Sequence, residues 1–157
     1  MIFNNLKIFC DIFNHKKGCI LAIDYGQKKL GIAISDDSRI FAVPVTTIHA
    51  NKIPIQVDSI IKLTTHYDFL AIVLGIPLTL IGDETEQSKI VRTFAHELDK
   101  KIKLPIILYD EKFTSKIANN ILKDQGIKRK VRNEEDDKIA ASVLLQSLLD
   151  QIKNTIN

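Results

Sequence analysis

The sequence predicts an α/β fold with a mixed five-stranded sheet that carries helices on both faces. Short apolar runs separated by tight turns fill residues 19–45, a pattern typical of consecutive antiparallel strands. Beyond residue 53, segments with apolar residues at helical spacing alternate with continuous apolar runs, which indicates strand–helix crossovers. The length of 157 residues, with 45% hydrophobic and 26% charged side chains, suits one globular domain rather than a disordered chain.

Three strands open the main fold. The apolar run 19–23 ends at Asp24, and residues 30–35 alternate small and apolar side chains. Residues 39–45 form the third expected strand, with Pro44 near its end at a sheet edge. Because the turns between them are short, we expect a three-strand antiparallel meander.

Helices and strands alternate in the rest of the chain. Right-handed crossovers between the later strands should place helices on both faces of the sheet. The expected elements are a helix at 53–67, a strand at 69–76, a helix at 85–101, a strand at 105–109, a helix at 115–125, a charged loop at 126–136 and a final helix at 137–152.

The first residues stand apart from this pattern. Ile2, Leu6, Phe9 and Phe13 recur at helical spacing and predict a short amphipathic helix. We interpret residues 1–17 as an N-terminal amphipathic extension that packs on the core or on a second copy of the chain.

Composition excludes several classes of protein. No apolar run approaches the ~20 residues that span a bilayer, so we expect no membrane partner and a cytoplasmic protein. Cys10 and Cys19 make neither a disulfide framework nor a zinc site. The net charge of +3 is too small to indicate a nucleic-acid partner by itself.

Three acidic residues stand at the ends of expected elements and are candidate catalytic residues. Asp24 ends the first strand, Glu111 follows the last strand, and Asp137 opens the final helix. Such ends can meet beyond the carboxyl edge of a sheet, where crowded carboxylates favour hard divalent cations such as Mg²⁺ or Mn²⁺. Two such ions could support an in-line phosphoryl displacement. Taken singly, each acid could instead be a turn, loop or helix-capping residue.

Four segments in this order resemble the YqgF family, also called RuvX. These RNase H-like proteins were first described as Holliday junction resolvases and are now generally regarded as pre-16S rRNA nucleases. The segments that carry the resemblance are Ile23–Asp36, Leu74–Leu78 with Gly82, Tyr109–Ser115, and Asp137–Gln146.

The resemblance implies an RNase H-like nuclease domain over residues 18–153, a hydrolase that acts on ester bonds. It implies that Asp24, Glu111 and Asp137 bind the metal and catalyse cleavage of RNA, with a role in 5′-end maturation of pre-16S rRNA on a ribosomal particle. This sequence departs from the family pattern at Lys112, where arginine is usual, and at Ser115, where threonine is usual. Lysine keeps the positive charge but lacks the bidentate fork of arginine.

Basic residues near the acids are candidate substrate contacts. A cationic segment before Asp137 would attract a polyanion, although such a run is also typical of a solvated loop. Further lysines lie at the opposite lip of the expected site, and Thr114 belongs to the third resembling segment. The substrate-binding candidates are Lys28, Lys29, Lys112, Thr114, Lys128, Arg129, Lys130 and Arg132.

Two other functions stay open at this point. A Holliday junction resolvase acting on structured DNA would need a homodimer with two sites, whereas an RNA nuclease could be a monomer. A ribosome-assembly factor that binds RNA without cutting it is the other alternative, motivated by Lys112 and Ser115.

Overall fold

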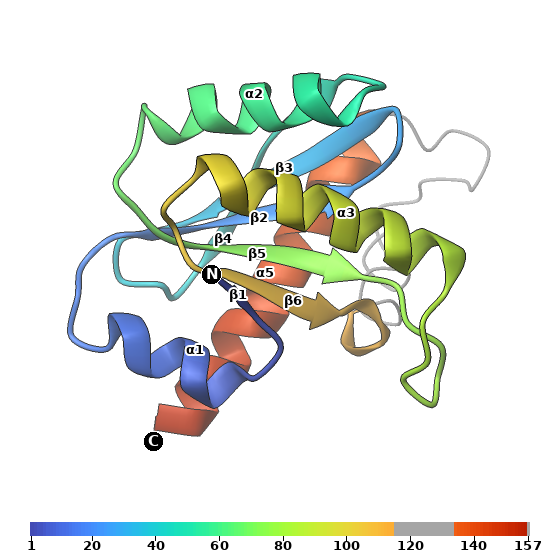
Figure 1. The fold of residues 1–157 in the computed structure, drawn as a ribbon. Coiled ribbons are helices and arrows are strands. Elements are labelled where there is room, and N and C mark those ends of the chain that lie inside the picture. Colours follow the sequence, from blue (N-terminus) through green and yellow to red (C-terminus); the bar gives the residue numbers. More distant parts are fainter. Residues whose placement is uncertain (115–133, 157) are drawn as a thin grey trace.

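A computed structural model describes residues 1–114 and 134–156, which form a three-layered α/β structure around one sheet (Figure 1). The strands of this part of the chain are β1 (Ile2–Phe3), β2 (Cys19–Tyr25), β3 (Lys29–Ser35), β4 (Ala42–His49), β5 (Phe69–Ile76) and β6 (Ile106–Asp110). Its helices are α1 (Leu6–Phe13), α2 (Ile53–Thr64), α3 (Glu86–Lys101), the 3₁₀ turn η1 (Glu111–Phe113) and α5 (Glu134–Ile156). None of the helices described is long and apolar enough to cross a membrane.

The sheet has the predicted mixed topology. Strands β2, β3 and β4 pair in antiparallel fashion as the expected meander, while β5 pairs in parallel with β2 and β6 in parallel with β5. The order across the sheet is β1-β6-β5-β2-β3-β4. The carboxyl ends of β2, β5 and β6 therefore lie together at one edge.

The described sheet has six strands where the sequence predicts five. The additional strand is β1, which pairs in parallel with β6 through Ile2 and Ile106. A strand of two residues is too short to show an alternating pattern. The spacing of the apolar residues at the start of the chain therefore predicted only the helix α1 that follows. The expected division between residues 1–17 and residues 18–153 stays a prediction.

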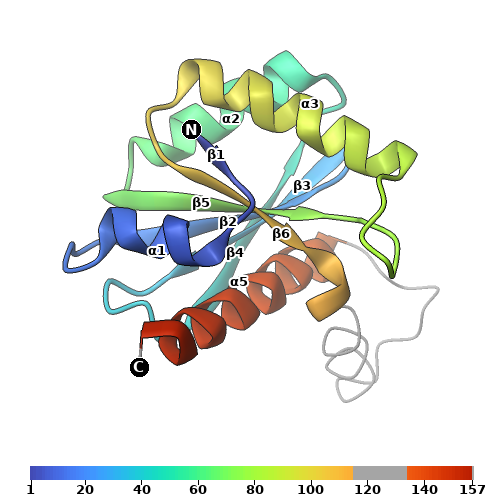
Figure 2. The ribbon, with the colours of Figure 1, turned by 60° about the horizontal axis from the view of Figure 1, so that its bottom comes forward.

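Helices cover both faces of the sheet, as Figure 2 shows almost edge-on. One face packs against α2 and α3, whose buried side chains include Ile60 and Phe94. The other face packs against α1 and α5, which contribute Phe9 and Leu145 to a second cluster. Along each strand, alternate residues point to the two clusters, and this alternation decides which side chains face α5.

Several predicted boundaries are wrong: β4 continues to His49 rather than ending at residue 45, and α2 ends at Thr64 rather than at residue 67. Strand β4 begins at Ala42 rather than at residue 39, because the Asp36 carboxylate accepts hydrogen bonds from the backbone N–H groups of Ile40 and Phe41 and holds a turn there. Helix α5 already includes Glu134, so residues 134–136 are not loop and Asp137 does not open the helix. Acidic residues stabilise the first turn of a helix, which explains why a highly charged stretch is helical. The predicted helix at 115–125 and the loop up to residue 133 lie outside the described residues.

Candidate active site

Asp24 lies in a row of residues that crosses three strands at the carboxyl edge of the sheet. Ile20 and Ala22 of β2 belong to the cluster under α5, so Asp24 points to the same face by alternation. On one side it pairs with Gly31 of β3. On the other side Gly75 of β5 stands beside it, one residue after the pairing of β2 with Leu74. Asp24 thus has a glycine beside it on each neighbouring strand, Gly31 on β3 and Gly75 on β5.

Gly31 brings Asp137 to this row. A Cβ atom on Gly31 would lie 1.9 Å from the backbone oxygen of Asp137, a distance that no structure tolerates. Helix α5 therefore rests with its backbone directly on β3, opposite Asp24. Glycine inside a strand often marks such a close approach of another chain segment.

Gly75 makes room for Glu111 in the same way. A Cβ atom on Gly75 would lie 3.0 Å from Oε1 and 3.2 Å from Cγ of Glu111, which belongs to η1. The Glu111 side chain therefore folds back over β5 toward the strand that carries Asp24. The structure brings together all three acids that the sequence predicted.

The three carboxylates influence one another electrostatically. Burial, followed by the negative charges of Glu111 and Asp137, raises the pKa of Asp24 to about 7. Burial also raises the pKa of Glu111, with a further contribution from Asp110. Among the acids of the described residues, Asp24 therefore has the most clearly raised pKa, and a nearby cation would favour its charged form.

A pocket of about 310 Å³ opens beside Asp24 and Asp137 and is lined on its other side by the turn between β2 and β3. This turn supplies Lys28 and Lys29 to the pocket, and the Lys29 ammonium lies 2.9 Å from Oδ2 of Asp137. Two predicted substrate contacts thus share one pocket with two predicted catalytic acids.

The buried Gln56 of α2 holds this turn in place. Its side-chain amide donates hydrogen bonds to the backbone oxygens of Gly26, at 3.0 Å, and Ala50, at 2.9 Å. A buried amide between two carbonyl groups fixes a turn that has few other contacts. The lysines of the pocket are therefore carried by a turn with a defined conformation.

The other predicted substrate contacts are placed differently. The Lys112 ammonium lies 3.3 Å from Asp110 and above the ring of Phe113, and does not line the pocket. The Thr114 hydroxyl is buried and donates to the backbone oxygen of Glu111, so it stabilises η1. The remaining candidates, Lys128, Arg129, Lys130 and Arg132, lie outside the described residues.

Comparison with known proteins now identifies the family. A family model described as "RuvX: Holliday junction resolvase" matches residues 18–151. The chain belongs to the RuvX family. A protein of Rickettsia peacockii (strain Rustic) with the name "Putative pre-16S rRNA nuclease" is 45% identical over 154 residues, which cover 98% of this chain and 99% of that protein. A Rickettsia conorii protein of the same name is 47% identical over 135 residues, which cover 86% of this chain and 88% of the relative.

The solved structures confirm the RNase H-like fold. RuvC of T. thermophilus in complex with a Holliday junction substrate matches with a TM-score of 0.56 at 11% identity, and the match covers 88% of this chain and 96% of RuvC. A second structure of Thermus thermophilus RuvC gives a TM-score of 0.54 at 10% identity, over 86% of this chain and 96% of RuvC. As a RuvX protein with relatives named as nucleases, the chain is a hydrolase that acts on ester bonds.

The acids of this RuvX protein fit a divalent cation by their chemistry. They offer only carboxylate oxygens, the donors that Mg²⁺ and Mn²⁺ prefer. Burial, followed by the charges of Glu111 and Asp137, raises the pKa of Asp24, and a nearby cation would favour its charged form. In residues 1–114 and 134–156, however, no three His, Cys, Asp or Glu side chains lie close enough together to hold a metal ion as they stand.

Sequence reasoning missed three residues that shape the site. Gly31 and Gly75 could have been found, because glycine inside an apolar strand pattern signals a close approach. Gln56 gives no such signal, since a single polar residue on a helix is ordinary. Asp136 is 8% exposed, and within the described parts of the chain neither of its carboxylate oxygens has a hydrogen-bond partner.

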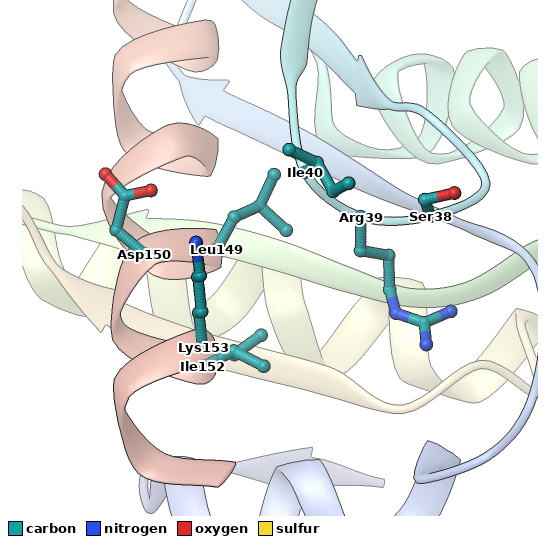
Figure 3. A pocket seen from close by; sticks show the side chains of 7 residues that line it. All are labelled: Ser38, Arg39, Ile40, Leu149, Asp150, Ile152 and Lys153. Carbon is teal, nitrogen blue, oxygen red and sulfur yellow. The ribbon is translucent and has the colours of Figure 1, made fainter. Parts of the chain in front are cut away.

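A second cavity, of about 360 Å³, lies between the turn before β4 and the end of α5 (Figure 3). The Arg39 guanidinium donates hydrogen bonds to the backbone oxygens of Lys16 and Gly18 and joins this turn to the segment after α1. Because the turn follows β3, which runs antiparallel to β2, the cavity is at the edge opposite Asp24. Its lining residues are Ser38, Arg39, Ile40, Leu149, Asp150, Ile152 and Lys153.

Proposed function

We propose that this RuvX protein is a divalent-metal-dependent nuclease that cleaves phosphodiester bonds in RNA, with 5′-end maturation of pre-16S rRNA as its role. The observation that carries the proposal is the placement of Asp24 between Glu111 and Asp137, where burial and then the charges of these two acids raise its pKa to about 7. The name of the Rickettsia relatives supports the choice of substrate. Its partner would then be the precursor RNA or the ribosomal particle that carries it, in the cytoplasm.

Each acid has a defined place in this proposal. Asp24, Glu111 and Asp137 would hold Mg²⁺ or Mn²⁺ at the carboxyl edge of the sheet. When bound, the cation supplies an activated water and neutralises charge that develops on the scissile phosphate. Asp24 is fixed by β2, and the two glycines beside it fix the approach of the other acids.

The basic residues would bind the RNA backbone. Lys28 and Lys29 line the pocket that contains Asp24 and Asp137, so a phosphate in that pocket meets positive charge opposite the acids. The further substrate contacts in this proposal are Lys112, Thr114, Lys128, Arg129, Lys130 and Arg132.

The decisive experiment follows cleavage of a labelled RNA that spans the 5′ end of 16S rRNA and its leader. In Mg²⁺ we expect the wild type to cut and Asp24→Asn to lose activity while its circular dichroism stays unchanged. Asp58→Asn is the matched control, because Asp58 is an exposed carboxylate that pairs with Lys101 on the other face of the sheet. Equal cleavage by Asp24→Asn and the wild type would show that the site is wrongly placed.

The description of the matching family model supports a second candidate function, resolution of a Holliday junction, which is a four-way DNA junction. A resolvase that cuts two strands symmetrically requires two sites, hence a dimer. Sedimentation of the full chain, combined with cleavage of a synthetic four-way DNA junction, separates the two functions. A monomer that cuts RNA but not the junction supports the RNA nuclease, and a dimer that cuts only the junction contradicts it.

The third alternative is an RNA-binding assembly factor without catalysis. Lys112 is engaged by Asp110, so one basic residue of the third resembling segment does not point into the pocket. If the wild type binds the leader RNA and produces no cleavage with Mg²⁺ or Mn²⁺, binding is the function and the nuclease proposal fails.

A further inference from the structure

The loop 77–85, which joins β5 to α3, presents two apolar side chains to solvent at its tip. Leu80 is 89% exposed and Ile81 is 84% exposed, more than any other large apolar side chain in the described parts of the chain. One exposed apolar residue is ordinary on a protein surface. Two adjacent ones with almost no protein contact are a feature that needs an explanation.

The tip of this loop has a defined conformation. The Gly82 N–H donates to the backbone oxygen of Thr79 at 2.9 Å, and the Thr79 N–H donates to that of Asp83, also at 2.9 Å. The Thr79 hydroxyl accepts a third bond from the Asp83 N–H. Gly82 has a φ of +87°, which favours glycine. Leu80 and Ile81 are therefore held outward by a closed turn.

The base of the loop is fastened as well. The Thr85 hydroxyl donates to the backbone oxygen of Pro77 at 2.7 Å and closes the loop. Glu84 accepts a hydrogen bond from Ser88 at 2.6 Å and another from Nε of Arg92 at 2.8 Å, both on α3. Because the loop is already ordered, contact with a partner would cost little further conformational entropy.

The loop leaves the sheet at the edge that carries the candidate acids. Ile76, the last residue of β5, pairs with Asp110 directly before Glu111, and β5 also runs in parallel beside β2. Figures 1 and 2 both show the loop beyond the ends of β5 and β6, on the side of η1. The loop therefore lies at the same edge of the sheet as Asp24 and Glu111.

The aromatic side chains near the acids pack against other rings, and Tyr25 and Tyr109 are buried. Tyr25 is 8% exposed and packs on Phe94, with 4.8 Å between ring centroids. Phe113 packs against Tyr109, and the ammonium group of Lys112 lies over its ring. Phe113 is 49% exposed, so among the described residues at this edge the most exposed apolar side chains are Leu80 and Ile81 at the tip of the loop.

We propose that Leu80 and Ile81 form an apolar wedge that packs against an unstacked base of the RNA substrate next to the scissile phosphate. This inference rests on the proposed function and adds a base contact to it. Lys28 and Lys29 would bind backbone phosphates, whereas the wedge would bind a nucleobase face. Aliphatic side chains insert between bases in several nucleic-acid complexes, and base faces accept apolar contacts whatever their sequence.

Binding of a fluorescein-labelled single-stranded RNA of mixed sequence, in Ca²⁺ in place of Mg²⁺, tests the wedge. We expect the double variant Leu80→Ser/Ile81→Ser to raise Kd about tenfold, with an unchanged salt dependence because no charge is lost. The matched control is Ile40→Ser/Phe41→Ser, since these residues are 55% and 65% exposed at the opposite edge of the sheet. Its Kd should equal that of the wild type.

A direct contact can be seen with a single fluorophore. The chain contains no tryptophan, so Leu80→Trp introduces the only indole. Stacking on a base should quench its emission when RNA is added, while the indole of Phe41→Trp should not respond. Quenching in both variants or in neither would overturn the wedge.

The outcomes separate the wedge from the proposed nuclease. Weaker RNA binding by the double variant supports the wedge even if the wild type cuts no RNA, in which case only the nuclease proposal fails. Unchanged RNA binding by the double variant overturns the wedge even if the wild type cuts RNA well. Two further results also overturn the wedge: no RNA binding by any variant, or loss only of binding to a protein partner.

Discussion

Gly75→Ala should slow cleavage without unfolding the protein. Gly75 lies on the face of β5 that Glu111 covers, and its backbone φ is not in the left-handed region, so alanine can adopt the same backbone conformation. The added methyl group would meet the Glu111 side chain before it meets anything else. The substitution therefore shifts the Glu111 side chain while all three carboxyl groups remain present in the protein.

The size of the effect follows from the distances. The new Cβ would be 3.0 Å from Oε1 and 3.2 Å from Cγ of Glu111, whereas ordinary contacts begin at 3.4 Å. Glu111 must then retreat by a few tenths of an ångström. A displacement of ~1 Å can cost about 100-fold in rate, so we expect a fall of about fivefold. Stability should change by less than about 1 kcal/mol, because alanine reduces the entropy of the unfolded chain and offsets mild crowding.

The assay is single-turnover cleavage of the leader RNA in Mg²⁺, with thermal unfolding of each variant alongside. The matched background is Glu111→Asp, whose shorter side chain leaves room for the methyl group. In that background Gly75→Ala should have almost no further effect, a coupling of about 1 kcal/mol in the double-mutant cycle. Unchanged cleavage by Gly75→Ala, or an equal loss in both backgrounds, would refute the reasoning.

Three other substitutions address the surrounding structure. Gly31→Ala would place a methyl group 1.9 Å from a backbone oxygen of α5, so we expect thermal unfolding to show a loss of about 3 kcal/mol or more; a smaller loss would mean that α5 does not rest on β3. Gln56→Leu removes two hydrogen bonds of a buried amide, one to Gly26 in the turn before β3 and one to Ala50 after β4, and should cost about 2 kcal/mol in urea unfolding, whereas Ser59→Ala on the exposed side of α2 should cost far less. Asp24→Asn should raise stability at pH 8 but not at pH 4, as measured by thermal unfolding.

The strands and helices were largely predictable because each pattern spans several residues. The apolar run of β5 and the helical spacing in α3 correspond to the elements observed. The errors occur where a local contact outweighs the pattern. The turn before β4 depends on the Asp36 side chain, and β1 is defined only by its partner strand.

The sequence predicted that three acids could meet at one edge of the sheet, but it did not predict the contacts that bring them near one another. Asp24, Glu111 and Asp137 stand at element ends, and parallel strands bring such ends to one edge. What brings them near one another is the absence of side chains at Gly31 and Gly75, which follows from sheet register rather than from spacing along the chain. The hydrogen bonds from Gln56 to Gly26 and Ala50 join segments that are distant in sequence, and no local pattern reveals such contacts.

Asp24 shows what such a site costs the fold. Burial and the charges of Glu111 and Asp137 raise its pKa from 3.8 to about 7. The folded chain then binds this proton more tightly than the unfolded chain, so the free energy of unfolding falls as pH rises through the range between these two values. The whole shift corresponds to at most about 4 kcal/mol above pH 7.

Asparagine cannot ionise, so Asp24→Asn should remove this loss at pH 8 and leave stability nearly unchanged at pH 4, where Asp24 is protonated in the folded chain. Mg²⁺ should raise the Tm of the wild type at pH 8 and have much less effect on the variant, because a cation that binds only the folded state stabilises it. A variant that is less stable than the wild type at pH 8 would mean that the acids do not repel one another. The burial and the repulsion that weaken the fold at neutral pH would both be offset by a cation at the edge of the sheet, so stability and the proposed activity compete at this residue.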